Sequence, residues 1–247
     1  MRGGRRRGFT AALAGPVLCG ALLTGCSGSD QQLAGSGHPT PSGTPHHAVG
    51  TPAEQLAGLV AVAADRHYTA TYRYVPKGRS ARTITVTLAT DGTWRVDVPG
   101  GGLGGGRDIS VAATRAGVYQ CGAADPASCE QVAGRGHSVP PRYDPRVERL
   151  FTRWLPTLGD RAAALSVADA PAPRGVPGRC FSVEPTAASL SSPVPSGVYC
   201  LAEDGTVTGA RLGLGTVTLT GRPASAPGSV SLAGPVTAGA AVPTRSP

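Results

Sequence analysis

The sequence is poor in aromatic and charged residues. Of its 247 residues, 4% are aromatic and 15% are charged, whereas 40% are hydrophobic. A disordered polyelectrolyte would carry more charge, and a membrane bundle needs apolar runs of roughly 18 residues, which do not occur here. The formal net charge of +8 includes the arginines of the first seven positions, and the other basic residues are dispersed. These numbers predict a folded domain that does not bind nucleic acid.

Catalytic and metal-binding motifs are also lacking. The chain has no GxSxG, SxxK, HExxH, CxxC or P-loop motif. Gly100, Gly102 and Gly105 match the letters of the dinucleotide fingerprint GxGxxG. That fingerprint requires a helix to follow, but Ile109 and Val111 continue a strand pattern, so we predict a flexible hairpin loop there. We therefore expect a protein that is not an enzyme and that holds neither a cofactor nor a metal.

The N-terminal segment has the layout of an export signal. Arg2 to Arg7 form a positive region, and Thr10 to Leu23 form an apolar region too short to span a bilayer. The following stretch LTGC, residues 23–26, resembles the bacterial lipobox, which implies cleavage after residue 25 and a diacylglycerol on Cys26. The resemblance predicts a signal peptide over 1–25 and a protein anchored on the extracytoplasmic face of the cell membrane.

Two alternatives remain open for this segment. Cys26 is an ordinary residue if the leader is instead cut at a standard signal-peptidase site nearby. The stretch RRGF, residues 6–9, resembles a twin-arginine signal, but Arg5 stands where that signal has Ser or Thr. Both the twin-arginine and the general secretory route are therefore compatible with the sequence.

Four cysteines remain once Cys19 and Cys26 are set aside with the leader and anchor. An even number of cysteines in an exported domain predicts disulfides. Of the three possible pairings we favour the two that close short loops. These are Cys121 with Cys129 and Cys180 with Cys200.

Low-complexity segments flank the predicted domain. Residues 26–50 are dominated by Gly, Ser, Pro, Thr and His, which predicts a flexible linker behind the anchor. Residues 237–247 have a similar composition and are predicted to form a disordered tail. The folded domain is expected over 51–236.

The domain is predicted to begin with a helix and continue as a sheet. Thr51, Pro52 and Glu54 form a capping box with a first-turn proline, so a helix should run to about residues 65–67. From Tyr68 the hydrophobic period changes to two, and we predict antiparallel strands. Asp91 and Gly92 predict a two-residue hairpin turn between two of these strands.

A second helix and more strands are predicted downstream. Asp144 and Pro145 provide an N-cap and a first helical residue, an apolar stripe follows, and Pro156 should end the helix. Asp204-Gly205 predicts a second tight turn. The expected strands after the helix are 163–169, 179–184, 197–202, 206–212, 216–220 and 229–232.

The order of these elements resembles the LolA-like lipoprotein carriers, and within them the actinobacterial LprG and LppX type. The segments that carry the resemblance are YTATYRY at 68–74, DGTWRVD at 91–97 and GVYCLAEDG at 197–205. The resemblance implies an α+β fold in which a curved antiparallel sheet forms a half β-barrel and helices pack on its concave face. It also implies an apolar cavity between them that receives acyl chains.

From this resemblance we expect an envelope lipoprotein that binds or transfers a lipid or another amphiphile. Alternation along the strands and the helical stripes assign nine residues to the cavity. They are Leu59, Tyr72, Ile84, Val86, Leu88, Trp94, Val96, Phe151 and Trp154.

Two other functions remain open. One is an interaction or sensor module of the same fold with a filled core. The other is an extracytoplasmic enzyme, which would require a cluster of a carboxylate and a hydroxyl around His67 or His137. The identity of a lipid or of a protein partner does not follow from the sequence.

Overall fold

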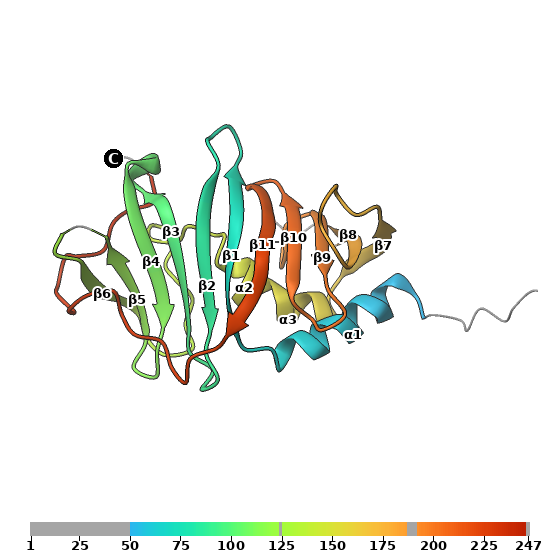
Figure 1. Cartoon of the computed structure of the whole chain (residues 1–247), viewed down its shortest axis with the longest axis horizontal. Coiled ribbons are helices and arrows are strands. Elements are labelled where there is room, and N and C mark those ends of the chain that lie inside the picture. Colours follow the sequence, from blue (N-terminus) through green and yellow to red (C-terminus); the bar gives the residue numbers. More distant parts are fainter. Residues whose placement is uncertain (1–49, 124, 187–191, 246–247) are drawn as a thin grey trace, which may run out of the picture. The chain divides into compact units, whose positions relative to one another are not determined.

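The computed structural model describes residues 50–123, 125–186 and 192–245. The predicted signal peptide, Cys26 and all but the last residue of the predicted linker lie outside the described residues. Within the described part, the main element is an open, curved antiparallel sheet of eleven strands (Figure 1). Its strand order is β6-β5-β4-β3-β2-β1-β11-β10-β9-β8-β7, so the first and last strands of the chain meet at the centre.

Most of the strands follow the alternating segments of the sequence. The first half of the sheet consists of β1 (Tyr68–Pro76), β2 (Arg82–Leu88), β3 (Trp94–Gly102), β4 (Arg107–Ala113), β5 (Val118–Gly122) and β6 (Ser128–Ala133). The second half consists of β7 (Leu165–Ala170), β8 (Arg179–Pro185), β9 (Gly197–Leu201), β10 (Val207–Leu212) and β11 (Gly215–Ser225). A short 3-10 helix, Leu103–Gly105, joins β3 to β4, so the glycine-rich stretch leads into a strand rather than into the helix of a dinucleotide site.

Helix α1 (Pro52–Ala64) begins where the capping box predicts. The Thr51 backbone N–H donates to Glu54 Oε2 at 2.8 Å, and the Glu54 N–H donates to Thr51 Oγ1 at 3.3 Å. Hydrogen bonds from the Thr51 backbone and hydroxyl hold the pKa of Glu54 below its ordinary value. Leu56 and Val60 lie on the buried face of the helix.

The predicted second helix is instead two short helices, α2 (Arg149–Thr152) and α3 (Trp154–Gly159). Asp144 does not cap a helix, because its carboxylate accepts from the Arg146 N–H and Arg146 has a φ of 68°. Pro156 is the third residue of α3, where the missing N–H would have no helical partner. A proline there is incompatible with one continuous helix, so the helices separate at Arg153.

The predicted two-residue hairpin turn is a three-residue loop. The Ala89 N–H donates to the Thr93 carbonyl at 2.9 Å and the Gly92 N–H donates to the Ala89 carbonyl at 3.1 Å. Gly92 has a φ of 79°, and Asp91 Oδ1 accepts from the Thr93 N–H at 3.0 Å. The β9–β10 turn repeats these hydrogen bonds over residues 202–206.

One strand prediction is wrong, and one strand was missed. Residues 229–232 do not form a strand. The Val230 N–H donates to Thr93 Oγ1 at 3.0 Å, and the Ser231 carbonyl accepts from Arg95 at 3.2 Å, so side chains of the sheet hold this segment. Strand β6 was not predicted because its sequence, SCEQVA, does not alternate between apolar and polar residues.

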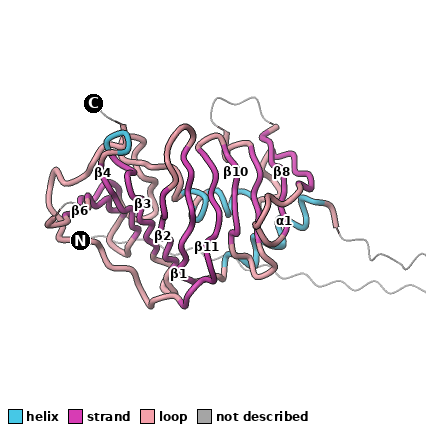
Figure 2. The backbone as a smooth tube through the Cα atoms, turned by 45° about the horizontal axis from the view of Figure 1, so that its top comes forward, coloured by secondary structure: helices cyan, strands magenta, loops and turns pink. Residues whose placement is uncertain are grey.

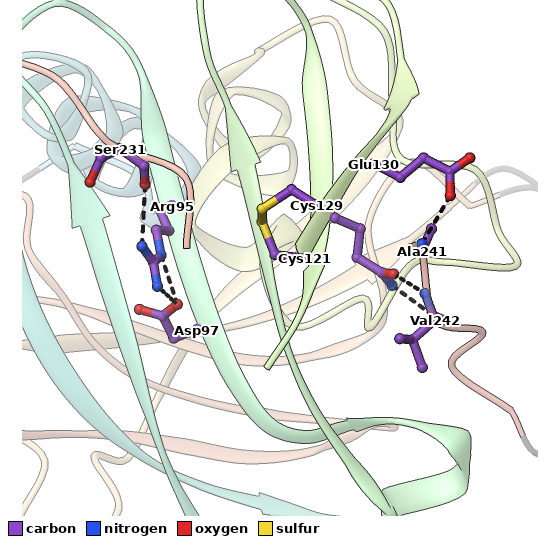
Figure 3. The surroundings of a disulfide bond; sticks show 9 residues. Arg95, Asp97, Cys121, Cys129, Glu130, Ser231, Ala241 and Val242 are labelled. Carbon is purple, nitrogen blue, oxygen red and sulfur yellow. Dashed lines mark hydrogen bonds and ion pairs between the residues drawn. A yellow bond between two sulfur atoms is a disulfide. The ribbon is translucent and has the colours of Figure 1, made fainter. Parts of the chain in front are cut away.

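The predicted disordered tail is ordered as far as residue 245. Figure 3 shows Ala241 and Val242 beside the strand pair β5–β6. The fully buried side chain of Gln120 donates to the Val242 carbonyl at 2.8 Å and accepts from its N–H, while Glu130 accepts from the Ala241 N–H at 2.9 Å. A low-complexity segment is ordered here because polar side chains at the edge of the sheet bind its backbone.

Two disulfides link neighbouring strands, in the pairing that we favoured from the sequence. Cys121 is bonded to Cys129 between β5 and β6, and Cys180 to Cys200 between β8 and β9. One therefore lies in each half of the sheet, and the first is drawn in Figure 3.

The helices and one face of the sheet share the main hydrophobic core. Residues of α1, α2 and α3 pack in one cluster with residues of β1, β2, β3 and β8 to β11. The rings of Tyr72 and Phe151 lie 4.8 Å apart between their centroids. Figure 2 shows the helices along this one face. No helix within the described ranges is long and apolar enough to cross a membrane.

Candidate functional site

An apolar pocket lies where the helices meet the β2–β3 hairpin. Its volume is about 300 Å³. The C-terminal half of α1, the residues of α2 and α3, and both strands of the hairpin contribute to its wall. The largest apolar side chains in the wall are Val60, Leu88, Trp94, Phe151, Leu155 and Pro156.

The structure brings three of the nine predicted cavity residues to this pocket, namely Leu88, Trp94 and Phe151. The other six do not line it. Tyr72, Ile84, Val86, Val96 and Trp154 are buried in the hydrophobic core, and Leu59 packs against that core while half-buried.

The predicted cavity along the sheet is therefore mostly filled. Strand alternation identified the face correctly, because Tyr72, Ile84 and Val96 all point to the helical side. Alternation does not show whether a gap remains between that face and the helices. Here the Tyr72 ring fills much of it, and its hydroxyl donates to the Val207 carbonyl at 3.0 Å. Burial of this hydroxyl raises the pKa of Tyr72.

The rim of the apolar pocket carries an ion pair. Arg66 Nη2 lies 2.8 Å from Asp204 Oδ2 and 3.3 Å from Thr206 Oγ1. Partial burial opposes ionisation of Asp204, but hydrogen bonds from Thr206 and the charge of Arg66 outweigh it, so the pKa of Asp204 is lowered. The two charges of this pair offset each other at the rim, and the rest of the pocket wall is mostly apolar.

His67 also lies at this rim, where it is exposed. In the part of the chain that the structure describes, it has no hydrogen bond to a carboxylate or a hydroxyl. The described residues also contain no group of three or more His, Cys, Asp or Glu placed to hold a metal ion.

A second, more polar pocket adjoins the first. Its volume is about 210 Å³, and Trp94 and Thr152 line both pockets. Its wall adds the side chains of His137, Ser138 and Glu148. Arg149 and Arg153 also line it.

Glu148 is the main polar group that the sequence interpretation missed. Its side chain is 2% exposed, and Oε2 is buried with no hydrogen-bond partner among the described residues. Burial raises the pKa of Glu148 to about 7, although the charges of Arg153 and Arg146 act in the opposite direction. The sequence contains an indication that Glu148 is buried, because it lies between Val147 and Leu150, within the apolar stripe of the predicted helix.

Comparisons with known proteins give little support for assigning a family. No protein-family model matches the sequence, and no curated protein matches it. The crystal structure of MucB in complex with MucA(peri) matches with 13% sequence identity over 77% of this chain, at a TM-score of 0.33. The match spans 60% of the MucB chain. A likeness at this level carries no argument about fold or function.

Proposed function

We propose that this protein is an envelope lipoprotein that binds or transfers a lipid or another amphiphile. The observation that carries the proposal is the apolar pocket between the helices and the β2–β3 hairpin. Ligand sites are mostly apolar hollows of roughly 300–1,000 Å³, and this pocket lies at the lower end of that range. We therefore propose that it takes part of a single acyl chain.

The fold and the predicted anchor support the same proposal. An open curved sheet with helices on one face is the arrangement expected of a LolA-like half β-barrel. An anchor at Cys26 and a coil of about 25 residues would allow the domain to reach roughly 25–30 Å from the membrane surface. A linker with this reach would allow the pocket to approach the membrane and exchange lipids with it. Such exchange requires no chemical reaction by the protein.

The filled part of the core favours a second candidate, an interaction module without a lipid. Tyr72, Ile84, Val86 and Val96 are fully buried in the hydrophobic core between the sheet and the helices. In this case the apolar pocket would receive an apolar side chain of another envelope protein. The two candidates differ in whether the purified protein carries a bound lipid, which its mass shows.

The test uses native mass spectrometry of the exported protein carrying Cys26→Ser, so that any lipid detected is bound non-covalently. Two matched variants on α1 locate the site. Ala64→Phe places a ring in the wall of the pocket, whereas Val62→Phe changes a residue of the same helix that is 46% exposed and does not line it.

We expect a lipid mass on the parent protein and on Val62→Phe, lost on extraction with organic solvent and depleted in Ala64→Phe. A bare polypeptide mass in all three proteins, persisting after incubation with envelope lipids, would contradict the proposal and favour the interaction module.

A further inference from the structure

The end of the C-terminal tail lies in a site that binds the backbone of one extended segment. The fully buried amide of Gln120 bonds both the N–H and the carbonyl of Val242. The backbone N–H groups of Leu103 and Gly104 donate to the carbonyls of the next two tail residues at 2.7 and 3.0 Å. Hydrogen bonds to the main chain are also what binds an extended peptide to a protein. The tail is therefore held as a bound peptide would be.

Two glycines of the sheet make room for the Val242 side chain. A Cβ added at Gly102 would lie 2.7 Å from Val242 Cγ1, and a Cβ added at Gly122 would lie 3.1 Å from Val242 Cγ2. At Gly122 the only other atom within 4 Å among the described residues, its chain neighbours aside, is the Ala240 carbonyl oxygen, which also belongs to the tail. The tail therefore fills a notch that Gly122 leaves open.

The tail also covers the edge strand β6. The Cys129 N–H donates to the Pro235 carbonyl at 2.8 Å, and the Cys129 carbonyl accepts from the Thr237 N–H at 2.7 Å. Strand β6 is the last strand at this end of the sheet, and an uncovered edge strand can pair with another chain. The tail thus occupies a surface along which two copies of the protein could associate.

The connection between the sheet and the tail allows the tail to leave. Residues 226–233 follow β11 and form neither a helix nor a strand. Once detached, residues 234–245 could extend by about 40 Å, at about 3.3 Å per residue. A second copy has an identical tail, so an exchange keeps the hydrogen bonds of the site and changes only the molecule that supplies the segment.

We propose that this site accepts the tail of a second copy in place of its own, which links two molecules of the protein. The segment that it recognises is Ala-Val-Pro-Thr, residues 241–244, because the side chain of Val242 fills the glycine notch and Pro243 has no N–H that needs a partner. In a single molecule the attached tail competes at a high effective concentration and keeps the site occupied. This inference does not depend on lipid binding.

The test uses two complementary variants of the full chain, each carrying Cys26→Ser. Val242→Asp places a carboxylate in the notch, so it should release the tail and leave the site open. Gly122→Val fills the notch, so it should release an unchanged tail and leave the site closed. Gly122 lies in β5 without a positive φ, and valine suits a strand, so this substitution should act on the tail alone.

We expect each variant to be monomeric by itself and an equimolar mixture of the two to form a one-to-one complex in sedimentation velocity. The association should be at least about a hundredfold tighter than that between two wild-type copies, whose own tails compete. Val236→Asp is the matched control, because Val236 lies in the same tail and is 55% exposed. Its tail should stay in place, and it should not bind the Gly122→Val protein.

A synthetic peptide of residues 234–245 gives a second measurement. It should bind the Val242→Asp protein, and a peptide with aspartate at the position of Val242 should not. Failure of this peptide to bind, absence of a complex in the mixture, or association of Gly122→Val with itself would overturn the inference, and none of these results concerns lipid binding.

Hydrogen exchange of residues 234–245 shows whether the tail has left its site. Protection of the tail that survives in Val242→Asp would contradict the recognition of Val242 by the notch. Near-ultraviolet circular dichroism shows whether each variant has folded.

Discussion

The two hairpins with nearly the same sequence have opposite surroundings. LATDGT at 88–93 and LAEDGT at 201–206 form the same three-residue loop with the same hydrogen bonds. At Gly92 an added Cβ would have no atom within 4 Å, whereas at Gly205 it would lie 2.4 Å from the Ala63 backbone nitrogen. The C-terminal end of α1 thus seals the second hairpin and leaves the first beside an open pocket. Local sequence determines the turn, and packing determines whether a site forms next to it.

The largest expected effect comes from adding one methyl group at each turn. Gly205→Ala combines a left-handed backbone, φ 78°, with a collision against the α1 backbone. It should lower the free energy of unfolding by about 3–5 kcal/mol. Gly92→Ala has the same backbone cost without the collision and should lose about 1–2 kcal/mol. Urea denaturation of both variants measures the difference, and equal losses would mean that the two turns are equally open.

The same two turns show which features could be predicted from the sequence and which could not. The dipeptide DG predicts a tight turn because glycine tolerates positive φ, and both turns are found, the first of them one residue longer than expected. No local pattern shows that Ala63 lies against Gly205 and not against Gly92, because this depends on where α1 crosses the sheet. The pocket beside Leu88 and Trp94 was therefore only partly predictable.

The other differences between sequence and structure have the same origin. The predicted cavity residue Tyr72 faces the helices as expected, but its ring fills the space that the alternation pattern left undefined. The C-terminal tail is held by Gln120 of β5 and by Glu130 of the edge strand β6, which was not predicted. Composition and local pattern indicate which structure a segment favours by itself. The positions of Tyr72 and of the tail depend instead on residues far away in the sequence.

The two pockets also differ, because the second is lined by a buried carboxyl group, Glu148, and the first is not. Its pKa is about 7 in the folded protein and 4.5 in the reference state, so the folded state binds more protons between these values. The contribution of Glu148 to stability should therefore fall as the pH rises from about 4.5 to 7 and then level off. Relative to wild type, Glu148→Gln should gain on the order of 3 kcal/mol at pH 8 and nothing near pH 4.

Thermal or urea unfolding across this pH range, in parallel for wild type and Glu148→Gln, measures the difference. The buried carboxylate Asp144 is present in both proteins, so its contribution cancels. A difference that does not change with pH would show that Glu148 is ionised or protonated equally in the folded and unfolded states.

The smallest effect is expected from the ion pair at the rim. Arg66 and Asp204 have side chains that are 35% and 53% exposed, so the pair should contribute less than about 1 kcal/mol. Asp204→Asn keeps an acceptor for the Thr206 N–H and should reduce stability by that amount at low salt, and by less at high salt. Asp91→Asn, at the equivalent position of the other turn, is the matched comparison: Asp91 lies 3.5 Å from Arg115, whose side chain is 79% exposed, so its loss should depend less on salt than the loss at Asp204. A loss at Asp204 that is independent of salt would contradict an electrostatic origin.

The central claim, that an acyl chain occupies the pocket beside the β2–β3 hairpin, is tested most directly by fluorescence quenching with a fatty acid brominated at the end of its chain. The protein has two tryptophans, Trp94 in the wall of the pocket and Trp154 in the core, and Trp154→Phe leaves Trp94 as the reporter. We predict saturable quenching of Trp94 by the brominated chain, none by the unbrominated one, and its loss in Ala64→Phe. Absence of saturable quenching, or quenching that persists in Ala64→Phe, would contradict the claim.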